Sequence, residues 1–141
     1  MQLRQRRNDL DSLPDITVKI NITFLFPGKK IQNDIMYIYN VTINIQEDVH
    51  EEWVEWMKTE HIPEMLSTGK FTKALMTRVM VQEEMGGMTY SVQYTTTNKE
   101  MLQRYYDENA AILRSKTKAF EGKYVAFRTE MQVVNEAHAN N

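Results

Sequence analysis

His61 is the residue of this chain best suited to acid–base chemistry. It directly precedes Ile62 and Pro63, where a helix should break or restart because proline has no backbone N–H to donate. An imidazole titrates near neutral pH, so a histidine at such a break can transfer protons. The competing interpretation is structural, with His61 capping a turn beside two tryptophans. The position therefore predicts a candidate catalytic residue and leaves both interpretations open.

The residues around His61 suggest a binding wall more than a metal site. Trp53 and Trp56 lie near the same face of the predicted helix, as core or as pocket wall, where an indole can stack on a planar ligand. Glu60 and Glu64 flank His61, but the intervening proline disturbs the helical register and no second histidine has ligand spacing. We therefore expect neither a metal nor another cofactor.

The elements that position these residues follow the order strand, helix, strand, strand, helix, strand. Alternation with a period of two predicts strands over 37–45, 71–84, 89–96 and 124–133. Helices are predicted over 48–69 and 97–120, with N-caps at Asp48 and Thr97. Gly86 and Gly87 predict a hairpin turn, because both tolerate positive φ. This order predicts an α+β, ferredoxin-like βαββαβ fold with a four-stranded antiparallel sheet and two helices on one face.

The face of the sheet without helices, here called the open face, is predicted to be mixed. It should carry Asn40, Thr42, Asn44, Arg78, Ser91, Gln93, Arg128 and Glu130, with Ile38, Met76, Met80 and Tyr124 among them. A face exposed only to water would seldom carry such apolar side chains. A dry dimer interface would not carry charged side chains without partners, because burying a lone charge is costly. We expect the partly wet inside of a two-subunit barrel; the alternative is an ordinary amphipathic surface. The expected ligand-binding residues on this face are Asn40, Arg78, Gln93 and Arg128.

The two arginines have two interpretations. Arg78 and Arg128 could hold a carboxylate ligand inside the barrel, because guanidinium groups bind carboxylates in a bidentate manner. They could equally pair with Glu130 or another acidic residue of the chain. The sequence leaves both open.

The composition of the chain excludes several kinds of functional site and classes of protein. The chain has 141 residues, no cysteine and a formal net charge of −2. The lack of cysteine excludes disulfides, thiolate zinc sites and cysteine nucleophiles, and it fits a cytoplasmic location. The charge argues against nucleic-acid binding, which usually needs a basic stripe. No apolar run reaches the roughly 20 residues that span a bilayer, so we expect no membrane segment.

The two ends of the chain fall outside the strand and helix pattern. Residues 1–35 are expected to be a flexible leader, or a segment upstream of a natural start at Met36. Residues 36–134 should form one ferredoxin-like α/β-barrel domain. Residues 135–141 should be a frayed tail.

Four segments carry a resemblance to a known family. They are MYIYNVTIN (36–44), WVEWMKTEHIPEML (53–66), TRVMVQEEMGGMTYSVQYTT (77–96) and KYVAFRTE (123–130). Over 36–134 the chain resembles the bacterial "domain of unknown function" family numbered 4286. That family is similar to the dimeric α/β-barrel superfamily, which pairs two ferredoxin-like subunits sheet to sheet and includes cofactor-free monooxygenases and haem-degrading enzymes. The resemblance implies a homodimer, and a proton-transfer role for His61 like that of helix histidines in superfamily enzymes.

Three functions remain open from the sequence. The first is a homodimeric α/β-barrel protein that binds a small organic molecule in the barrel. The second is an assembly or interaction module without a ligand. The third is a monooxygenase-like or isomerase-like enzyme that uses His61. RNA binding is disfavoured, because the aromatic residues of the third strand lie on the core row and the domain is acidic.

Overall fold

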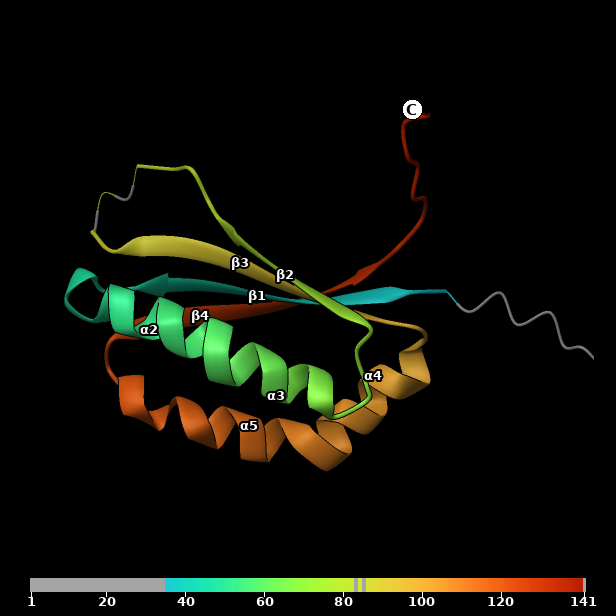
Figure 1. Cartoon of the computed structure of the whole chain (residues 1–141), viewed down its shortest axis with the longest axis horizontal. Coiled ribbons are helices and arrows are strands. Elements are labelled where there is room, and N and C mark those ends of the chain that lie inside the picture. Colours follow the sequence, from blue (N-terminus) through green and yellow to red (C-terminus); the bar gives the residue numbers. More distant parts are fainter. Residues whose placement is uncertain (1–34, 83, 85, 141) are drawn as a thin grey trace, which may run out of the picture. The chain divides into compact units, whose positions relative to one another are not determined.

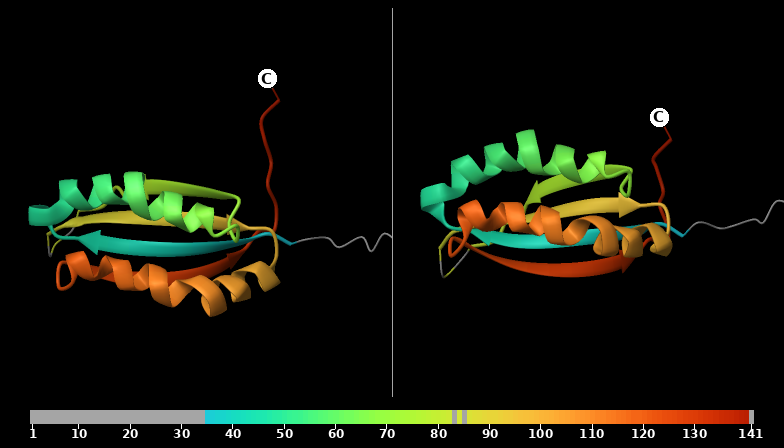
Figure 2. Two further views of the ribbon diagram at one scale, coloured as in Figure 1. Left: turned by 60° about the horizontal axis from the view of Figure 1, so that its bottom comes forward. Right: turned by 90° about the horizontal axis from the view of Figure 1, so that it is seen from below.

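The sheet and its helices form two layers. The computed structural model describes residues 35–82, 84 and 86–140. Four antiparallel strands in the order β2-β3-β1-β4 carry helices on one face only (Figures 1 and 2). The strands are β1 (Tyr37–Ile45), β2 (Lys73–Arg78), β3 (Met88–Thr96) and β4 (Tyr124–Gln132). The predicted α+β ferredoxin-like βαββαβ architecture is confirmed.

Each helical rod contains a π-helical turn. The first rod consists of α2 (His50–Trp56), the π turn Met57–His61 and α3 (Ile62–Ser67). The second consists of α4 (Lys99–Tyr105), the π turn Tyr106–Ala110, α5 (Ala111–Ser115) and a 3-10 segment, Lys116–Phe120. Pro63 lies in the first turn of α3, where a missing N–H costs little. The backbone stays helical from His50 to Ser67, so the chain does not leave the helix at Pro63, and a π turn directly precedes α3.

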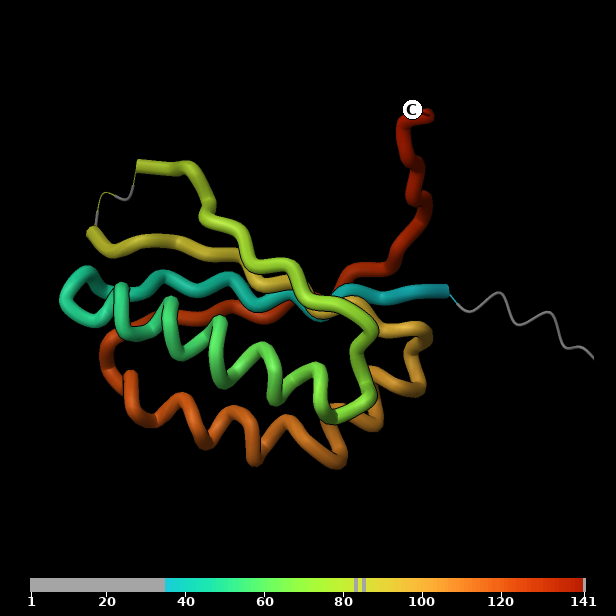
Figure 3. The backbone as a smooth tube through the Cα atoms, viewed as in Figure 1, coloured from blue at the N-terminus to red at the C-terminus, as the bar shows by residue number. Residues whose placement is uncertain are grey.

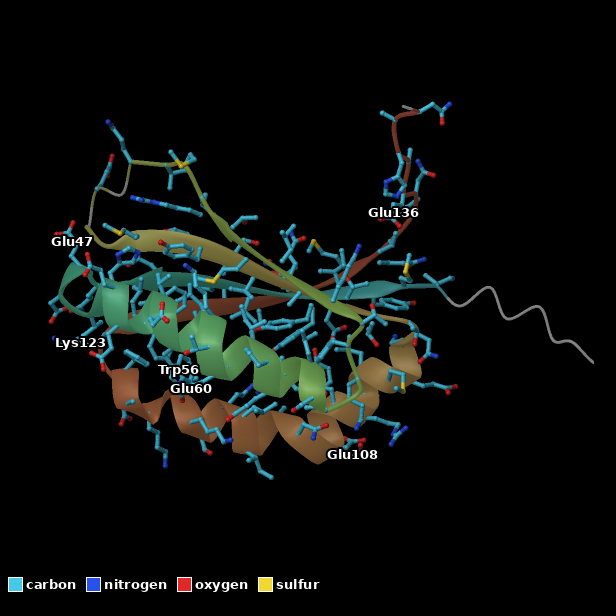
Figure 4. All side chains as sticks on the ribbon, viewed as in Figure 1. Glu47, Trp56, Glu60, Glu108, Lys123 and Glu136 are labelled. Atoms are coloured by element: carbon cyan, nitrogen blue, oxygen red, sulfur yellow. The ribbon has the colours of Figure 1, made fainter. Side chains whose placement is uncertain are left out.

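The predicted N-caps are both wrong. The second rod is capped by Asn98, whose Oδ1 accepts a hydrogen bond from the Met101 N–H at 2.9 Å. Asp48 is not an N-cap, because it lies inside the 3-10 turn Glu47–Val49 that precedes α2, and its carboxylate accepts a hydrogen bond from Lys123 Nζ at 2.6 Å (Figure 4, Lys123). That partner lies at the start of β4, where a pattern of neighbouring residues cannot reveal it.

The predicted faces of β4 are also wrong. In the β1–β4 pairing, Arg128 lies opposite Val41 and Glu130 opposite Tyr39. Directly opposed residues share a face of the sheet, and the Tyr39 ring packs on aromatic residues of the second rod. Arg128 and Glu130 therefore face the helices, as does Tyr124 on the same row.

The same reversal applies to β2, the other edge strand. Met76 lies opposite the buried Val92 and Arg78 opposite Tyr90, which places both on the helix-covered face. Leu75 lies opposite Gln93 and therefore points to the open face. The strand ends at Arg78, so Met80 lies outside the sheet and is 87% exposed.

The open face is therefore more apolar than predicted. Its residues are Ile38, Asn40, Thr42, Asn44, Lys73, Leu75, Thr77, Thr89, Ser91, Gln93, Thr95, Val125, Phe127, Thr129 and Met131. The exposed fractions are 57% for Leu75, 58% for Val125 and 68% for Phe127. Hydrophobicity alone would place these three side chains in the core, but the helices cover the opposite row of each edge strand.

The connection from β2 to β3 is longer than a tight hairpin. The chain leaves the sheet after Arg78 and returns at Met88 (Figure 3). Gly86 and Gly87 have φ values of +79° and +77°, so the predicted positive φ is confirmed. A Cβ atom at Gly87 would lie 2.6 Å from Asn44 Oδ1 and 2.8 Å from Ile45 O, so a side chain there would collide with β1.

The C-terminal segment crosses to the open face. The Val133 N–H donates to Met36 O at 2.9 Å, after which 133–140 have no regular secondary structure. Glu136 lies on the side of the sheet away from the helices (Figure 4), with its carboxylate 3.7 Å from Lys73 Nζ of β2. The predicted leader, apart from Ile35, lies outside the described residues. Among the described helices, none has the length and apolar character to cross a membrane.

Candidate ligand-binding site

A cavity of about 50 Å³ lies between the helix-covered face of the sheet and the two rods. Its walls come from β1, β3, β4 and both rods, and most of them are aromatic or aliphatic. Polar groups are few: the tyrosine hydroxyls, Thr117 and the charged or ionisable side chains of His61, Arg114 and Arg128. One water needs about 10–15 Å³ of such space. The cavity therefore holds only a few waters, and a larger ligand must displace side chains.

His61 is the ionisable group that the first rod contributes to this cavity. It ends the π turn and stacks on Trp56, with ring centroids 4.8 Å apart and planes 24° from parallel. Its Nδ1 is buried and has no hydrogen-bond partner among the described residues. Burial lowers the pKa of His61, nearby Glu64 opposes this and Lys116 adds to it. The imidazole is therefore neutral at neutral pH and has a nitrogen free to bind a ligand or accept a proton.

Both tryptophans of the chain line the cavity. Trp53 is only 3% exposed and packs on Tyr90 at a centroid distance of 5.2 Å. Trp56 is half-buried and lies between the two rods (Figure 4), with its ring 5.3 Å from that of Phe120. Trp56 is thus an aromatic wall that a ligand can contact, whereas Trp53 mainly supports the core.

Tyrosine hydroxyls and two guanidinium groups form the polar part of the cavity. Arg114 Nη2 donates to the Tyr39 hydroxyl at 3.2 Å. Burial raises the pKa of the neighbouring Tyr105, Tyr39 raises it further, and the positive charges of Arg114 and Arg128 lower it in part. Both guanidinium groups therefore act on the same tyrosine hydroxyl, although one comes from α5 and the other from β4.

A family assignment follows from the same region of the chain. Residues 36–134 match the family described as Domain of unknown function (DUF4286). The chain belongs to this family. The match covers the segments that carried the resemblance in the sequence, which is confirmed. No curated protein matches this DUF4286 member.

Solved structures of low sequence identity share the fold of this DUF4286 domain. A conserved protein of unknown function from Bacteroides thetaiotaomicron gives a TM-score of 0.54 at 15% identity, covering 71% of this chain and 99% of that one. SnoaB, a cofactor-independent oxygenase from Streptomyces nogalater, gives 0.51 at 7% identity over 72% and 95%. A dimeric ferredoxin-like protein from an uncultured marine organism gives 0.52 at 12% identity over 73% and 99%. At these identities the likeness shows the ferredoxin-like fold.

The DUF4286 domain brings four of the predicted site residues together and separates three from them. Those at the cavity are His61, Trp53, Trp56 and Arg128. Asn40 and Gln93 lie on the open face, where Asn40 Oδ1 accepts a hydrogen bond from Ser91 Oγ at 2.7 Å. Arg78 is exposed at the end of β2 and does not line the cavity. The residues grouped from the sequence thus belong to two sides of the sheet.

Arg114 is the main cavity residue that the sequence analysis missed. An arginine on an amphipathic helix usually extends into water, so residue type alone gave no reason to select it. Its spacing did contain a signal, because Ala110, Arg114 and Thr117 follow the i, i+4, i+7 pattern of one helix face. Ala110 is 4% exposed and Thr117 lines the cavity, so this helix face borders the cavity, while Arg114 itself also reaches solvent.

We expect the wild-type protein to lose stability on mild acidification and the His61→Gln variant to lack this loss. The folded pKa of His61 is lowered, so the unfolded chain binds more protons below the ordinary histidine pKa of about 6.5. Stability should fall as pH drops through that value and level off below the folded pKa. Urea denaturation from about pH 7.5 to about pH 5 measures this slope. At the upper end the variant should lie within about 1 kcal/mol of the wild type, because Nδ1 has no protein partner to lose.

His138→Gln is the matched control for this experiment. His138 lies in the C-terminal segment with its side chain 81% exposed, so the control should keep the wild-type slope. Asp48 and Glu108 also have lowered pKa values through bonded lysines, but these carboxylates are exposed and titrate at lower pH in every variant. Equal slopes for wild type and His61→Gln would show that His61 is not the titrating group.

Proposed function

We propose that this protein is a homodimer that binds a small planar organic molecule in the cavity between its sheet and helices. The observation that carries the proposal is the unpartnered, buried Nδ1 of His61 beside the Trp56 ring. A buried polar atom without a partner is costly, and a ligand atom would satisfy it. The aromatic walls favour a flat molecule.

The dimer is supported by the open face. Leu75, Val125 and Phe127 expose more than half of their surface on a face that none of the described helices covers. Apolar surface of this kind commonly marks an interface, and a two-fold pairing of equal faces is the most frequent solution. A structural neighbour is described as a dimeric ferredoxin-like protein. Sheet-to-sheet pairing would form a barrel and leave each cavity on its own helical side.

A second candidate is an enzyme that uses His61 as a general base. A histidine held neutral can accept a proton from a weakly acidic ligand group, and burial holds His61 in that form. SnoaB, which shares the fold, is described as a cofactor-independent oxygenase. Oxygen uptake and the mass of any product formed under air would distinguish such an enzyme from a protein that only binds its ligand. In the enzyme, His61→Gln should abolish turnover. The cytoplasmic location stays a prediction.

Tryptophan fluorescence tests ligand binding directly. Both tryptophans line the cavity, so a planar aromatic compound that enters should quench emission in a saturable manner. Trp56→Phe should remove most of the quenching, whereas Trp53→Phe should retain it, because Trp56 is the half-buried wall and Trp53 is core. A panel of one-ring and two-ring compounds without any saturable response would contradict the proposal. Equal quenching in the Trp56→Phe protein would place binding elsewhere.

A further inference from the structure

Two arginines at the cavity have no acidic partner among the described residues. Some cations of the domain form ion pairs, Lys70 and Arg104 with Glu108, Lys116 with Glu64, and Lys123 with Asp48, whereas others, such as Lys58 and Lys99, form none within the described ranges. Arg114 bonds only the Tyr39 hydroxyl, and Arg128 has no hydrogen bond or ion pair within the described ranges. Both arginines are exposed to solvent as well as lining the cavity, and no described acid neutralises either of them.

The nearest candidate acid is already engaged. Glu130 lies two residues after Arg128 on the same face of β4. Its Oε1 accepts a hydrogen bond from the Tyr106 hydroxyl at 2.6 Å, and it forms no ion pair with either arginine. The pairing of Arg128 with Glu130 that the sequence left open is not formed. An anion from outside the chain would thus meet two guanidinium groups that no described acid neutralises.

The surroundings of these guanidinium groups are arranged for a flat acceptor. Arg114 is held by the Tyr39 hydroxyl, and Arg114, Arg128, Tyr39 and Tyr105 all line the same cavity. A guanidinium fork matches the two oxygens of a carboxylate. A carboxylate coplanar with an aromatic ring also stays thin, as a cavity of about 50 Å³ between aromatic walls requires. A tetrahedral phosphate is bulkier in every direction.

We propose that the ligand is an aromatic carboxylate whose acid group is bound by Arg114 and Arg128, with its ring against the Trp56 and His61 wall. This inference rests on the proposed function and specifies the chemical class of the ligand. It also divides the polar groups by task. The arginines bind the carboxylate, and His61 remains available for a second polar atom on the ring.

The test compares benzoate with its neutral isostere benzamide and with phenylphosphate, by calorimetry and tryptophan fluorescence on the full chain. Charged hydrogen bonds contribute about 1.5–3 kcal/mol, so benzoate should bind roughly 10- to 100-fold more tightly than benzamide. Arg114→Gln and Arg128→Gln should each weaken benzoate binding by about 10-fold or more and leave benzamide binding unchanged. Circular dichroism melting would verify that both variants fold.

Arg104→Gln is the matched control. Arg104 lies on α4, pairs with Glu108 and does not line the cavity, so this variant should bind benzoate like the wild type. Equal affinity for benzoate and benzamide, tighter binding of phenylphosphate, or unchanged benzoate binding in both cavity variants would overturn the carboxylate assignment while the binding cavity stands. No binding of any of the three compounds would overturn the proposed function together with it.

Discussion

Phe127→Glu is expected to convert the proposed homodimer into a monomer. Phe127 is 68% exposed on the open face, beside Thr42 of β1 and two residues from Val125. If two such faces pack together, the substitution buries an unpaired carboxylate, which costs several kcal/mol. The dimer dissociation constant should rise by roughly 100-fold or more. Multi-angle light scattering at micromolar concentration should then report half the wild-type mass.

Ile112→Glu is the control for this experiment. Ile112 is 64% exposed, almost as much as Phe127, but it lies on α5, on the helical side of the molecule. The same charge placed there should leave the dimer intact. A wild-type protein that is monomeric at micromolar concentration would contradict sheet-to-sheet pairing, and so would a Phe127→Glu protein that remains dimeric.

Phe71→Ala is expected to cause the largest loss of stability. Phe71 is 5% exposed and joins the sheet to the second rod through its ring contacts. Its centroid lies 4.9 Å from that of Tyr105 and 5.5 Å from that of Tyr94. Removing a buried phenyl ring costs about 3–5 kcal/mol, a large part of the roughly 5–15 kcal/mol that stabilises a domain. Urea denaturation followed by circular dichroism measures the loss.

Phe71→Leu separates packing volume from aromatic contact. Leucine fills much of the same space, so this variant should lose less than half as much stability as Phe71→Ala. Phe71 does not line the cavity, so ligand binding should persist in both variants at temperatures where they remain folded. A loss of under about 1 kcal/mol for Phe71→Ala would show that the cluster is loosely packed.

The central strands could be predicted from the sequence because their two rows differ in kind. In β1, Tyr39, Ile43 and Ile45 alternate with Asn40 and Asn44, and the strand has the predicted bounds. In β4 both rows carry apolar residues, so alternation defines two faces without saying which is buried. Val125 and Phe127 are more hydrophobic than Tyr124 and Ala126, yet the helices cover the second pair. Which row of β4 is buried depends on the elements that pack against each face of the sheet: the helices on one face and the proposed dimer partner on the other.

The residues of the candidate site also divide into those that the sequence could group and those that it could not. Trp53, Trp56 and His61 could be grouped from the sequence, because they follow one another on a single rod. Arg114 could not, because its bonded partner Tyr39 is separated from it by 75 positions. Arg128 was selected for its charge but assigned to the wrong face, since its position depended on the register of an edge strand. Local spacing finds residues that share an element, and tertiary pairing decides which elements meet.

Because of the π turn at Met57–His61, deleting a single residue would change how the side chains before and after it are oriented on this rod. A π turn holds one residue more than the α-helical turn it replaces. Losing any one of these residues would leave a regular α-helix, and everything after the loss would rotate by about 100° about the helix axis. His61 could then no longer stack on Trp56 while Met65 stayed in the core. In an alignment of DUF4286 sequences, an uninterrupted count from Trp56 to Met65 would therefore distinguish members that retain this cavity from members that keep only the scaffold.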